Sequence, residues 1–299
     1  MRGIRKTVSL LLAVVMLAAL FVVADAAGAK TYLVLGDSIG YGLGVSNPDE
    51  ANYGRIVANT NGYNYYNDAI SGYRTDDLLR LINNDQNVIS HVRAADIISV
   101  SIGGNDYLRD NMAHLIAEVE VGNTSTVDRI AVTMKANIAA IVERLRALNP
   151  DALILMQTLY NPMEGQALGS VYAVPIGVLN DFIRDYRDEH PGCYEIADVA
   201  GAFHGRSGLI AFDTIHPNAQ GNIVIAQTVQ KKLYDLGEAE TDQILIVTEP
   251  VDHLSTKSFL TPLKSCSKRS RTSSNGCSAA ENRYKNPVGS LGRCRLGII

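Results

Sequence analysis

The sequence predicts an α/β fold in which helices cover both faces of a mainly parallel sheet. Two observations carry this prediction. Short, almost continuously apolar runs alternate with longer amphipathic stretches along the middle of the chain, as expected for strands buried on both faces by crossover helices. In addition, the candidate functional residues follow three of the predicted strands: Ser38 follows the first, Gly72 the second and Asn105 the third. In open parallel sheets, ligands bind beyond the carboxyl ends of the strands.

Each predicted element follows from its pattern and its boundaries. The expected strands are residues 32–35, 65–69, 96–102, 152–156 and 194–199. The expected helices are residues 49–59, 76–82, 127–148, 175–189 and 218–236. The long helix shows the clearest periodicity, because apolar side chains recur at three- and four-residue steps, at Ile130, Met134, Ile138, Ile141, Val142 and Leu145. Asn149-Pro150 ends it.

Residues 1–26 are typical of a signal peptide. Arg2, Arg5 and Lys6 precede an apolar run, and Ala24-Asp25-Ala26 places small residues where a signal peptidase requires them. The sequence therefore predicts a secreted protein with no stable membrane span after cleavage. The apolar run is also about as long as a spanning helix, so an uncleaved N-terminal anchor is the alternative.

Charge separates the middle of the chain from its end. Residues 28–237 hold 15 Lys and Arg against 24 Asp and Glu, a net charge of −9. Such an acidic surface repels phosphate backbones and argues against nucleic acid as a partner. Residues 238–299 form a separate tail that is basic towards its end, rich in Ser, Asn and Gly and without periodicity. We expect it to be disordered or not selected for folding, as after a shifted reading frame; a basic arm for an anionic wall polymer is the alternative.

The strongest chemical signal is a serine in a tight turn after the first strand, in Gly36-Asp37-Ser38-Ile39-Gly40. A serine hydroxyl is a weak nucleophile and needs a base beside it. Asp213-Thr214-Ile215-His216-Pro217 can supply one, because a carboxylate three residues before a histidine can hold its Nδ1–H and leave Nε2 for the serine. The candidate oxyanion donors are the N–H groups of Ser38 and Gly72 and the side-chain amide of Asn105.

Four short blocks in this order resemble the SGNH hydrolases, the GDSL-like lipases and acylhydrolases. They are Gly36-Asp37-Ser38-Ile39, Ser71-Gly72-Tyr73-Arg74-Thr75, Gly103-Gly104-Asn105-Asp106 and Asp213-Thr214-Ile215-His216-Pro217. The resemblance spans about residues 31–236, within the predicted 28–237 domain. Ile39 replaces the usual Leu, an apolar exchange. The resemblance implies a flavodoxin-like three-layer α/β/α sandwich.

The resemblance also implies a role for each site residue. Ser38 would be the nucleophile and one oxyanion donor, with Gly72 and Asn105 as the other donors. His216 would be the base and Asp213 its orienting partner.

Asp37 and Asp106 are interpreted as structural, bonding loop backbone beside the site. Neither a metal nor an organic cofactor is expected, and the histidines show no metal-ligand spacing.

The sequence thus predicts a carboxylic ester hydrolase, with the substrate open. Small-molecule, lipid and carbohydrate esters all fit, so a carbohydrate O-deacetylase and a lysophospholipase or thioesterase are alternatives on the same fold. A non-catalytic wall- or carbohydrate-binding module is the alternative from another class. Residues 107–126 and 160–172 are expected to form pocket walls. The oligomeric state is not predicted.

Two further motifs could indicate other folds, but the sequence supports each of them only weakly. Gly36 to Gly40 also satisfies the G-x-S-x-G nucleophile elbow of α/β-hydrolases. That elbow follows several strands, whereas Ser38 follows the first predicted strand. The glycine-rich stretch Gly40 to Gly44 has Val45 at the last position of a dinucleotide-binding motif, and no Gly-Lys-Ser/Thr follows, so nucleotide binding is poorly supported.

Overall fold

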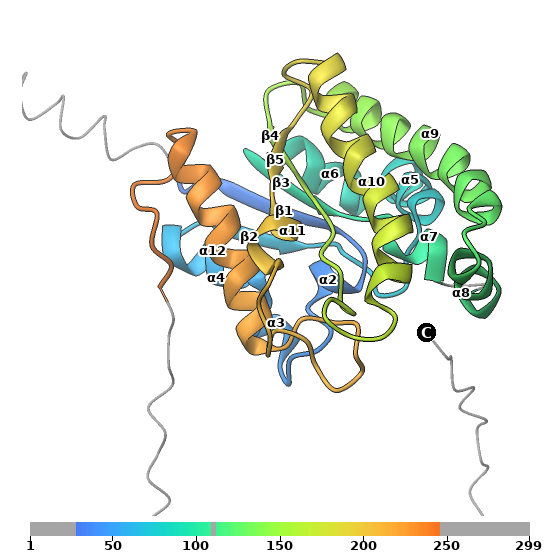
Figure 1. Cartoon of the computed structure of the whole chain (residues 1–299). Helices are drawn as coiled ribbons and strands as arrows, with labels where there is room; N and C mark the ends of the chain where they lie inside the picture. Colours follow the sequence, from blue (N-terminus) through green and yellow to red (C-terminus); the bar gives the residue numbers. More distant parts are fainter. Residues whose placement is uncertain (1–27, 109–111, 246–299) are drawn as a thin grey trace, which may run out of the picture. The chain divides into compact units, whose positions relative to one another are not determined.

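A parallel sheet forms the centre of the structure, a computed structural model that describes residues 28–108 and 112–245 (Figure 1). Within those residues its strands are β1 (Thr31–Gly36), β2 (Asn64–Asn67), β3 (Ile97–Ser101), β4 (Leu153–Gln157) and β5 (Glu195–Ala197). Their order is β2-β1-β3-β4-β5, and every neighbouring pair is parallel. β1 therefore lies between β2 and β3, and its carboxyl end lies between theirs.

Helices connect the strands and cover the sheet. They are α2 (Ser38–Tyr41), α3 (Pro48–Ala51), α4 (Tyr53–Asn61), α5 (Thr75–Asn84), α6 (Gln86–Ala94), α7 (Gly104–Leu108), α8 (Met112–Glu120), α9 (Ser125–Leu148), α10 (Gly169–Glu189), α11 (Val199–Phe203) and α12 (Ala219–Asp235). Figure 1 shows α5, α6, α9 and α10 on one side of the strands and α4 and α12 on the other.

Alternation along the strands divides the apolar core between the two faces. Leu33 and Leu35 of β1 pack in the cluster that includes α5, α6, α9 and α10. Tyr32 and Val34 pack in the other cluster, with α4, α11 and α12. Successive strand residues point to opposite faces, so a strand buried on both faces must be apolar throughout. The predicted three-layer α/β/α sandwich is confirmed.

Several element boundaries differ from the sequence prediction for local reasons. The helix expected at 49–59 is interrupted at Asn52, whose extended backbone begins α4 and whose side chain accepts the N–H of Arg55 at 2.8 Å. The helix expected from Pro175 begins at Gly169, so Pro175 lies inside α10. A proline in a helix removes one N–H bond, and α10 continues through this loss.

The prediction also omitted five short helices, of which α2 has only four residues. α6 has about two turns and buries three apolar side chains. The carboxylate of Asp85, the residue before its first turn, accepts two backbone N–H groups. α7 and α8 lie in the region expected only to form a pocket wall. α11 has five residues and follows β5 directly. Segments this short give too few turns for periodicity to distinguish them from loops.

The described chain continues beyond α12. The side chain of Lys30 forms an ion pair of 2.6 Å with Glu238, and the N–H of Leu245 donates to Thr60. Residues 238–245 therefore contact the domain. The predicted signal peptide and most of the predicted tail lie outside the described residues. Between 28 and 245, leaving out 109–111, no helix is both long and apolar enough for a bilayer crossing.

The long helix α9 offers a direct test of the core. Ile138 is fully buried against the sheet, whereas Val132 on the same helix is 72% exposed. We expect Ile138→Ala to lower the free energy of unfolding by about 3 kcal/mol, through lost burial and the cavity left behind. Val132→Ala, the matched control, should change it by less than about 0.5 kcal/mol. Urea denaturation followed by circular dichroism measures both, and equal effects would contradict the assigned core face.

Candidate active site

The turn after β1 presents Ser38 at the carboxyl end of the sheet. Gly36 has a φ of +133°, and a side chain there would collide with the backbone of Ser101 on β3. The N–H of Asp37 donates to that same carbonyl at 3.1 Å. Asp37 also accepts the N–H of Ile39 at 3.0 Å and so begins α2, whose first residue is Ser38. The close approach of the ends of β1 and β3 therefore determines where the serine lies.

A second turn brings Asp213 and His216 to this serine. His216 Nε2 lies 2.8 Å from Ser38 Oγ, and His216 Nδ1 lies 2.7 Å from Asp213 Oδ2. Ser38 is 6% and His216 3% exposed. The structure thus brings together the three predicted catalytic residues in one line of hydrogen bonds, in which Ser38 and His216 are buried and Asp213 is exposed. This arrangement allows the imidazole to take a proton from the hydroxyl while the carboxylate holds the ring.

Asp213 is prepared for this position by its own loop. Its Oδ1 accepts the N–H groups of Ile215 and His216, both at 3.0 Å. Burial alone would raise the pKa of Asp213, but these two N–H groups and the imidazole outweigh burial, so the pKa lies below its ordinary value. The carboxylate is therefore ionised at neutral pH and stabilises an imidazolium formed beside it.

The candidate oxyanion donors follow the strands on each side of β1. Gly72 lies after β2 and Asn105 after β3, on α7. The side-chain amide of Asn105 donates to the carbonyl of Tyr73 at 3.0 Å, so the two loops meet beside the Ser38 turn. Among the described residues, the N–H of Gly72 has no hydrogen-bond acceptor. Asn105 lines the pocket beside Ser38, whereas Gly72 is not among the residues that line it.

Asp106 fixes the glycine loop from the other side. Its carboxylate accepts both the side-chain hydroxyl of Thr75, at 2.6 Å, and the backbone N–H of Thr75, at 3.0 Å. Asn137 of α9 donates to the same hydroxyl oxygen at 3.0 Å. The interpretation of Asp37 and Asp106 as groups that bond loop backbone is confirmed. The sequence analysis did not predict these contacts of Thr75 and Asn137. An amide beside the apolar stripe of α9 could have indicated the contact of Asn137.

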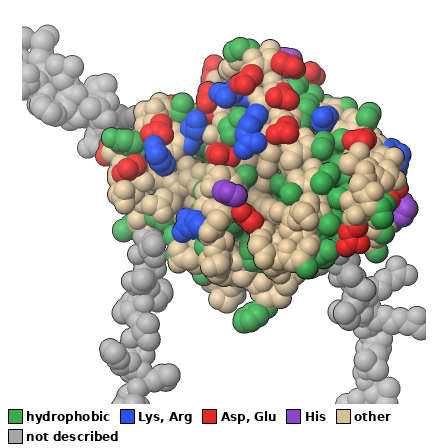
Figure 2. Space-filling model, in the orientation of Figure 1, with side chains coloured by type: hydrophobic (Ala, Val, Ile, Leu, Met, Phe, Trp, Pro, Cys, Tyr) green, Lys and Arg blue, Asp and Glu red, His purple; other side chains and the backbone are tan. Residues whose placement is uncertain are grey.

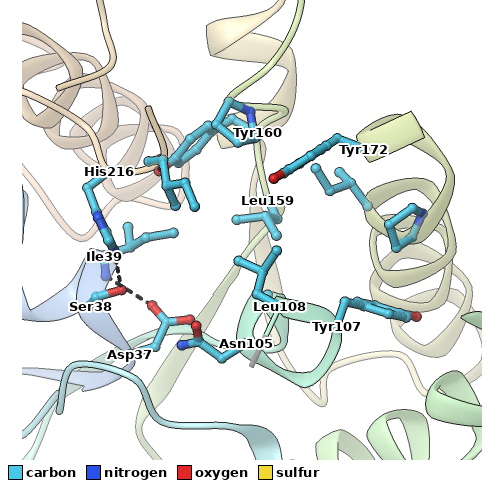
Figure 3. Close-up of a pocket in the computed structure, with 15 residues that line it drawn as sticks. Asp37, Ser38, Ile39, Asn105, Tyr107, Leu108, Leu159, Tyr160, Tyr172 and His216 are labelled. Atoms are coloured by element: carbon cyan, nitrogen blue, oxygen red, sulfur yellow. Dashed lines mark hydrogen bonds between the residues drawn. The ribbon is translucent and has the colours of Figure 1, made fainter. Parts of the chain in front are cut away.

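An apolar pocket extends from Ser38 (Figure 3). Ser38, Asp37 and Asn105 lie at one end of the view and Tyr172 and Tyr107 at the other. The apolar side chains lining it are Ile39, Tyr107, Leu108, Leu159, Tyr160, Pro162, Tyr172, Pro175, Ile176 and Ile215. Both segments that were expected to form pocket walls contribute, and α10 contributes residues that were not predicted. The lining favours an aliphatic or aromatic group next to the serine.

Charge on the visible surface is mixed. Figure 2 shows Lys and Arg side chains interspersed with Asp and Glu over the face turned to the viewer. This face thus carries no extended field of one sign. In the part of the chain that the structure describes, no three His, Cys, Asp or Glu side chains are grouped as metal ligands would be.

Comparisons with known proteins agree with this architecture. The model of the GDSL-like Lipase/Acylhydrolase family matches residues 34–223, which include every candidate site residue. Among solved structures, the lipase Lip_vut3 from a goat rumen metagenome is similar, with a TM-score of 0.55 and 21% identity, over 68% of this chain and 96% of that one. The extracellular lipase of Streptomyces rimosus gives 0.51 and 19%, over 65% and 95%.

A third similar structure is phospholipase A1 from Streptomyces albidoflavus, with a TM-score of 0.50 and 20% identity, over 65% of this chain and 95% of that one. At these identities the likeness concerns the fold. Among curated proteins, none is similar enough to this chain to count as a match.

Asp37 gives the site a testable pH dependence. Burial, together with the nearby charge of Asp106, raises the pKa of Asp37 from 3.8 to about 7, although the N–H of Ile39 opposes the shift. Because the folded pKa exceeds the unfolded one, the folded state binds more protons between about pH 4 and 7, and Asp37 lowers stability progressively as pH rises through that window.

Asp37→Asn keeps an acceptor for Ile39 but cannot ionise. We therefore expect its stability relative to the unsubstituted protein to increase between pH 4 and pH 8, by up to about 4 kcal/mol. Denaturant titrations of both proteins at several pH values measure this difference. A difference that stays constant with pH would contradict the raised pKa.

Proposed function

The chain belongs to the GDSL-like lipase/acylhydrolase family, and we propose that it cleaves carboxylic esters through an acyl intermediate on Ser38. Its family makes it a carboxylic ester hydrolase. The single observation that supports the mechanism is the hydrogen-bonded line from Asp213 through His216 to Ser38, with distances of 2.7 and 2.8 Å. A serine held this way is a nucleophile already placed beside its base.

The proposed reaction has two halves that use the same groups. His216 Nε2 takes the proton of Ser38 as Oγ attacks the ester carbonyl, and the protonated ring then gives that proton to the leaving alcohol. Water enters, His216 takes one of its protons, and the hydroxide attacks the acyl-serine. The acid leaves as the proton returns to Ser38. Asp213 stays ionised throughout and stabilises the imidazolium in both halves.

Three donors are proposed for the oxyanion of the tetrahedral intermediates. The N–H of Ser38 lies in the first turn of α2, where N–H groups have no partner within the helix. Gly72 N–H and the side chain of Asn105 supply the others. The bonds from Asn105 to Tyr73 and from Thr75 to Asp106 support this role, because they connect the two donor loops before substrate arrives.

The apolar pocket supports an aliphatic acyl group as the part of the substrate bound beside Ser38. Leu108, Leu159, Ile176 and Ile215 offer contact without hydrogen-bonding groups. An acetyl group would contact only a few of these side chains, so the lining supports acyl chains longer than acetyl. The arrangement of Ser38 and His216 also argues against a purely binding module, which has no need for a base on the hydroxyl.

Export from the cell is proposed from the sequence of residues 1–26. The basic start, the apolar run and Ala24-Asp25-Ala26 together support cleavage by a signal peptidase. The enzyme would then act on esters outside the cytoplasm. An uncleaved anchor would place the same domain at the membrane surface.

Replacing the nucleophile tests the mechanism. Ser38→Ala should lower kcat for an aryl ester by more than about a thousandfold while leaving the melting temperature nearly unchanged. Ser170→Ala, an exposed serine on α10, is the control and should keep full activity. A fluorophosphonate should label the unsubstituted protein and Ser170→Ala but not Ser38→Ala. Turnover that persists in Ser38→Ala would refute the acyl-serine intermediate.

Narrowing the pocket tests where the acyl group binds. Ile176 lines the pocket from α10, whereas Ala173 on the same helix is exposed and does not line it. We expect Ile176→Phe to lower kcat/KM for an octanoyl ester by about tenfold or more and to change that for an acetyl ester by less than about threefold. Ala173→Phe should alter neither. Equal losses on both esters in Ile176→Phe would contradict the assignment.

A further inference from the structure

The carbonyls of the two residues that flank His216, Ile215 and Pro217, each accept a hydrogen bond from a buried side chain. The hydroxyl of Tyr160 donates to the carbonyl of Ile215 at 2.7 Å. The side-chain amide of Asn222 on α12 donates to the carbonyl of Pro217 at 3.1 Å. Tyr160 is 2% exposed and Asn222 is fully buried. The imidazole is thus carried by a backbone segment that is fixed on both sides.

Tyr160 is itself held rigidly. It follows β4 by three residues, and its ring stacks on Phe203 of α11 with centroids 4.4 Å apart and an angle of 20° between planes. Burial raises the pKa of Tyr160 well above its ordinary value, and the carboxylates of Asp37 and Asp213 act in the same direction. The shift favours the protonated hydroxyl, which can therefore act as a donor at neutral pH.

The remaining hydrogen bonds of the segment 211–216 are almost all internal. The N–H of Ala211 donates to the carbonyl of His216, that of Thr214 to Ala211, and Asp213 accepts from Ile215 and His216. Among the described residues, the segment is bonded to the rest of the protein only through Ser38 and Tyr160. The hydrogen bond to Ser38 changes when the proposed reaction moves the serine proton. The bond from Tyr160 to the carbonyl of Ile215 is the one that persists.

We propose that Tyr160 is a positioning residue that holds His216 at hydrogen-bond distance from Ser38 through the carbonyl of Ile215. This inference rests on the proposed function. Without the hydroxyl, the carbonyl of Ile215 loses its donor in a partly buried place. The loop then moves as a unit, because the bonds between Asp213 and His216 travel with it. The ring leaves Ser38 while its pairing with Asp213 is retained.

Tyr160→Phe removes this hydroxyl and keeps the ring that lines the pocket and stacks on Phe203. Tyr194 provides a matched control, because it is 1% exposed and its hydroxyl donates to the carbonyl of Ile183 at 2.7 Å. Neither Tyr194 nor Ile183 lines the pocket. The two substitutions delete hydrogen bonds of the same kind and length, so they should lower the melting temperature to a similar extent.

The kinetic effects should separate the two variants. Tyr160→Phe is expected to lower kcat by roughly tenfold to a hundredfold, the scale of a misplaced catalytic group, with KM within about twofold of its original value. The rate of Ser38 labelling by a fluorophosphonate should fall by the same factor, and the ratio of kcat values should stay constant from pH 6 to 9. Tyr194→Phe should keep kcat and the labelling rate.

The outcomes distinguish the inference from the function beneath it. If Tyr160→Phe keeps the original kcat in a protein whose Ser38→Ala variant is inactive, the positioning role is wrong and the proposed mechanism stands. If Tyr194→Phe lowers kcat as much as Tyr160→Phe, the loss is one of general stability, which also refutes the inference. If the unsubstituted protein neither turns over esters nor reacts with the fluorophosphonate, the proposed function itself fails.

Discussion

Parallel pairing of β1 with both of its neighbours is the constraint from which the site follows. The register aligns Val34 with Asn67 of β2 and Gly36 with Ser101 of β3. Because parallel strands end at the same edge of a sheet, the turns after these three strands meet there although they are distant in sequence. The pairing is stabilised by apolar burial on both faces of β1, the largest favourable contribution that such a strand makes to folding.

Three buried or partly buried carboxylates near the serine show how local donors determine charge. Asp213 accepts two N–H groups and faces an imidazole, and its pKa is lowered. Asp37 accepts one N–H at the same kind of turn, is more deeply buried, and has a pKa of about 7. Asp106 accepts two groups of Thr75, yet burial still raises its pKa. Of the three, only Asp213, which is paired with the imidazole, has a lowered pKa, while burial raises the pKa of the other two.

Much of this arrangement could be predicted from the sequence. The sequence pattern predicted all five strands of the described sheet, with residues 65–69 the weakest candidate, and the turns after the strands predicted which edge holds the site. The candidate residues Ser38, Asp213 and His216 were found because short motifs keep their chemistry within a few residues. Two kinds of feature could not be predicted. The helices α6, α7, α8 and α11 are too short to show a periodic pattern. The start of α10 before Pro175 depends on tertiary contacts, which outweigh one lost hydrogen bond.

The same limit applies to the supporting residues. Thr75, Tyr160 and Asn222 form their key bonds with residues 31, 55 and 5 positions away. No local pattern distinguishes such a side chain from an ordinary core residue. Asn222 gave the best available signal, because an amide on the buried face of a helix must be satisfied by hydrogen bonds. Its partners, the carbonyl of Pro217 and the N–H of Tyr53, become visible only in the folded chain.

The turn that carries the base is best understood as a unit with its own geometry. Thr214 adopts a φ of +67°, an uncommon conformation for a β-branched residue, and this turn lets Asp213 accept both Ile215 and His216. Pairing of carboxylate and imidazole is therefore local, three residues apart, and independent of the sheet. The hydrogen bond between His216 and Ser38 joins residues 178 positions apart in the sequence, so it depends on tertiary contacts. The two contacts of the imidazole therefore have different origins, because the one with Asp213 comes from the local turn and the one with Ser38 from the packing of the whole domain.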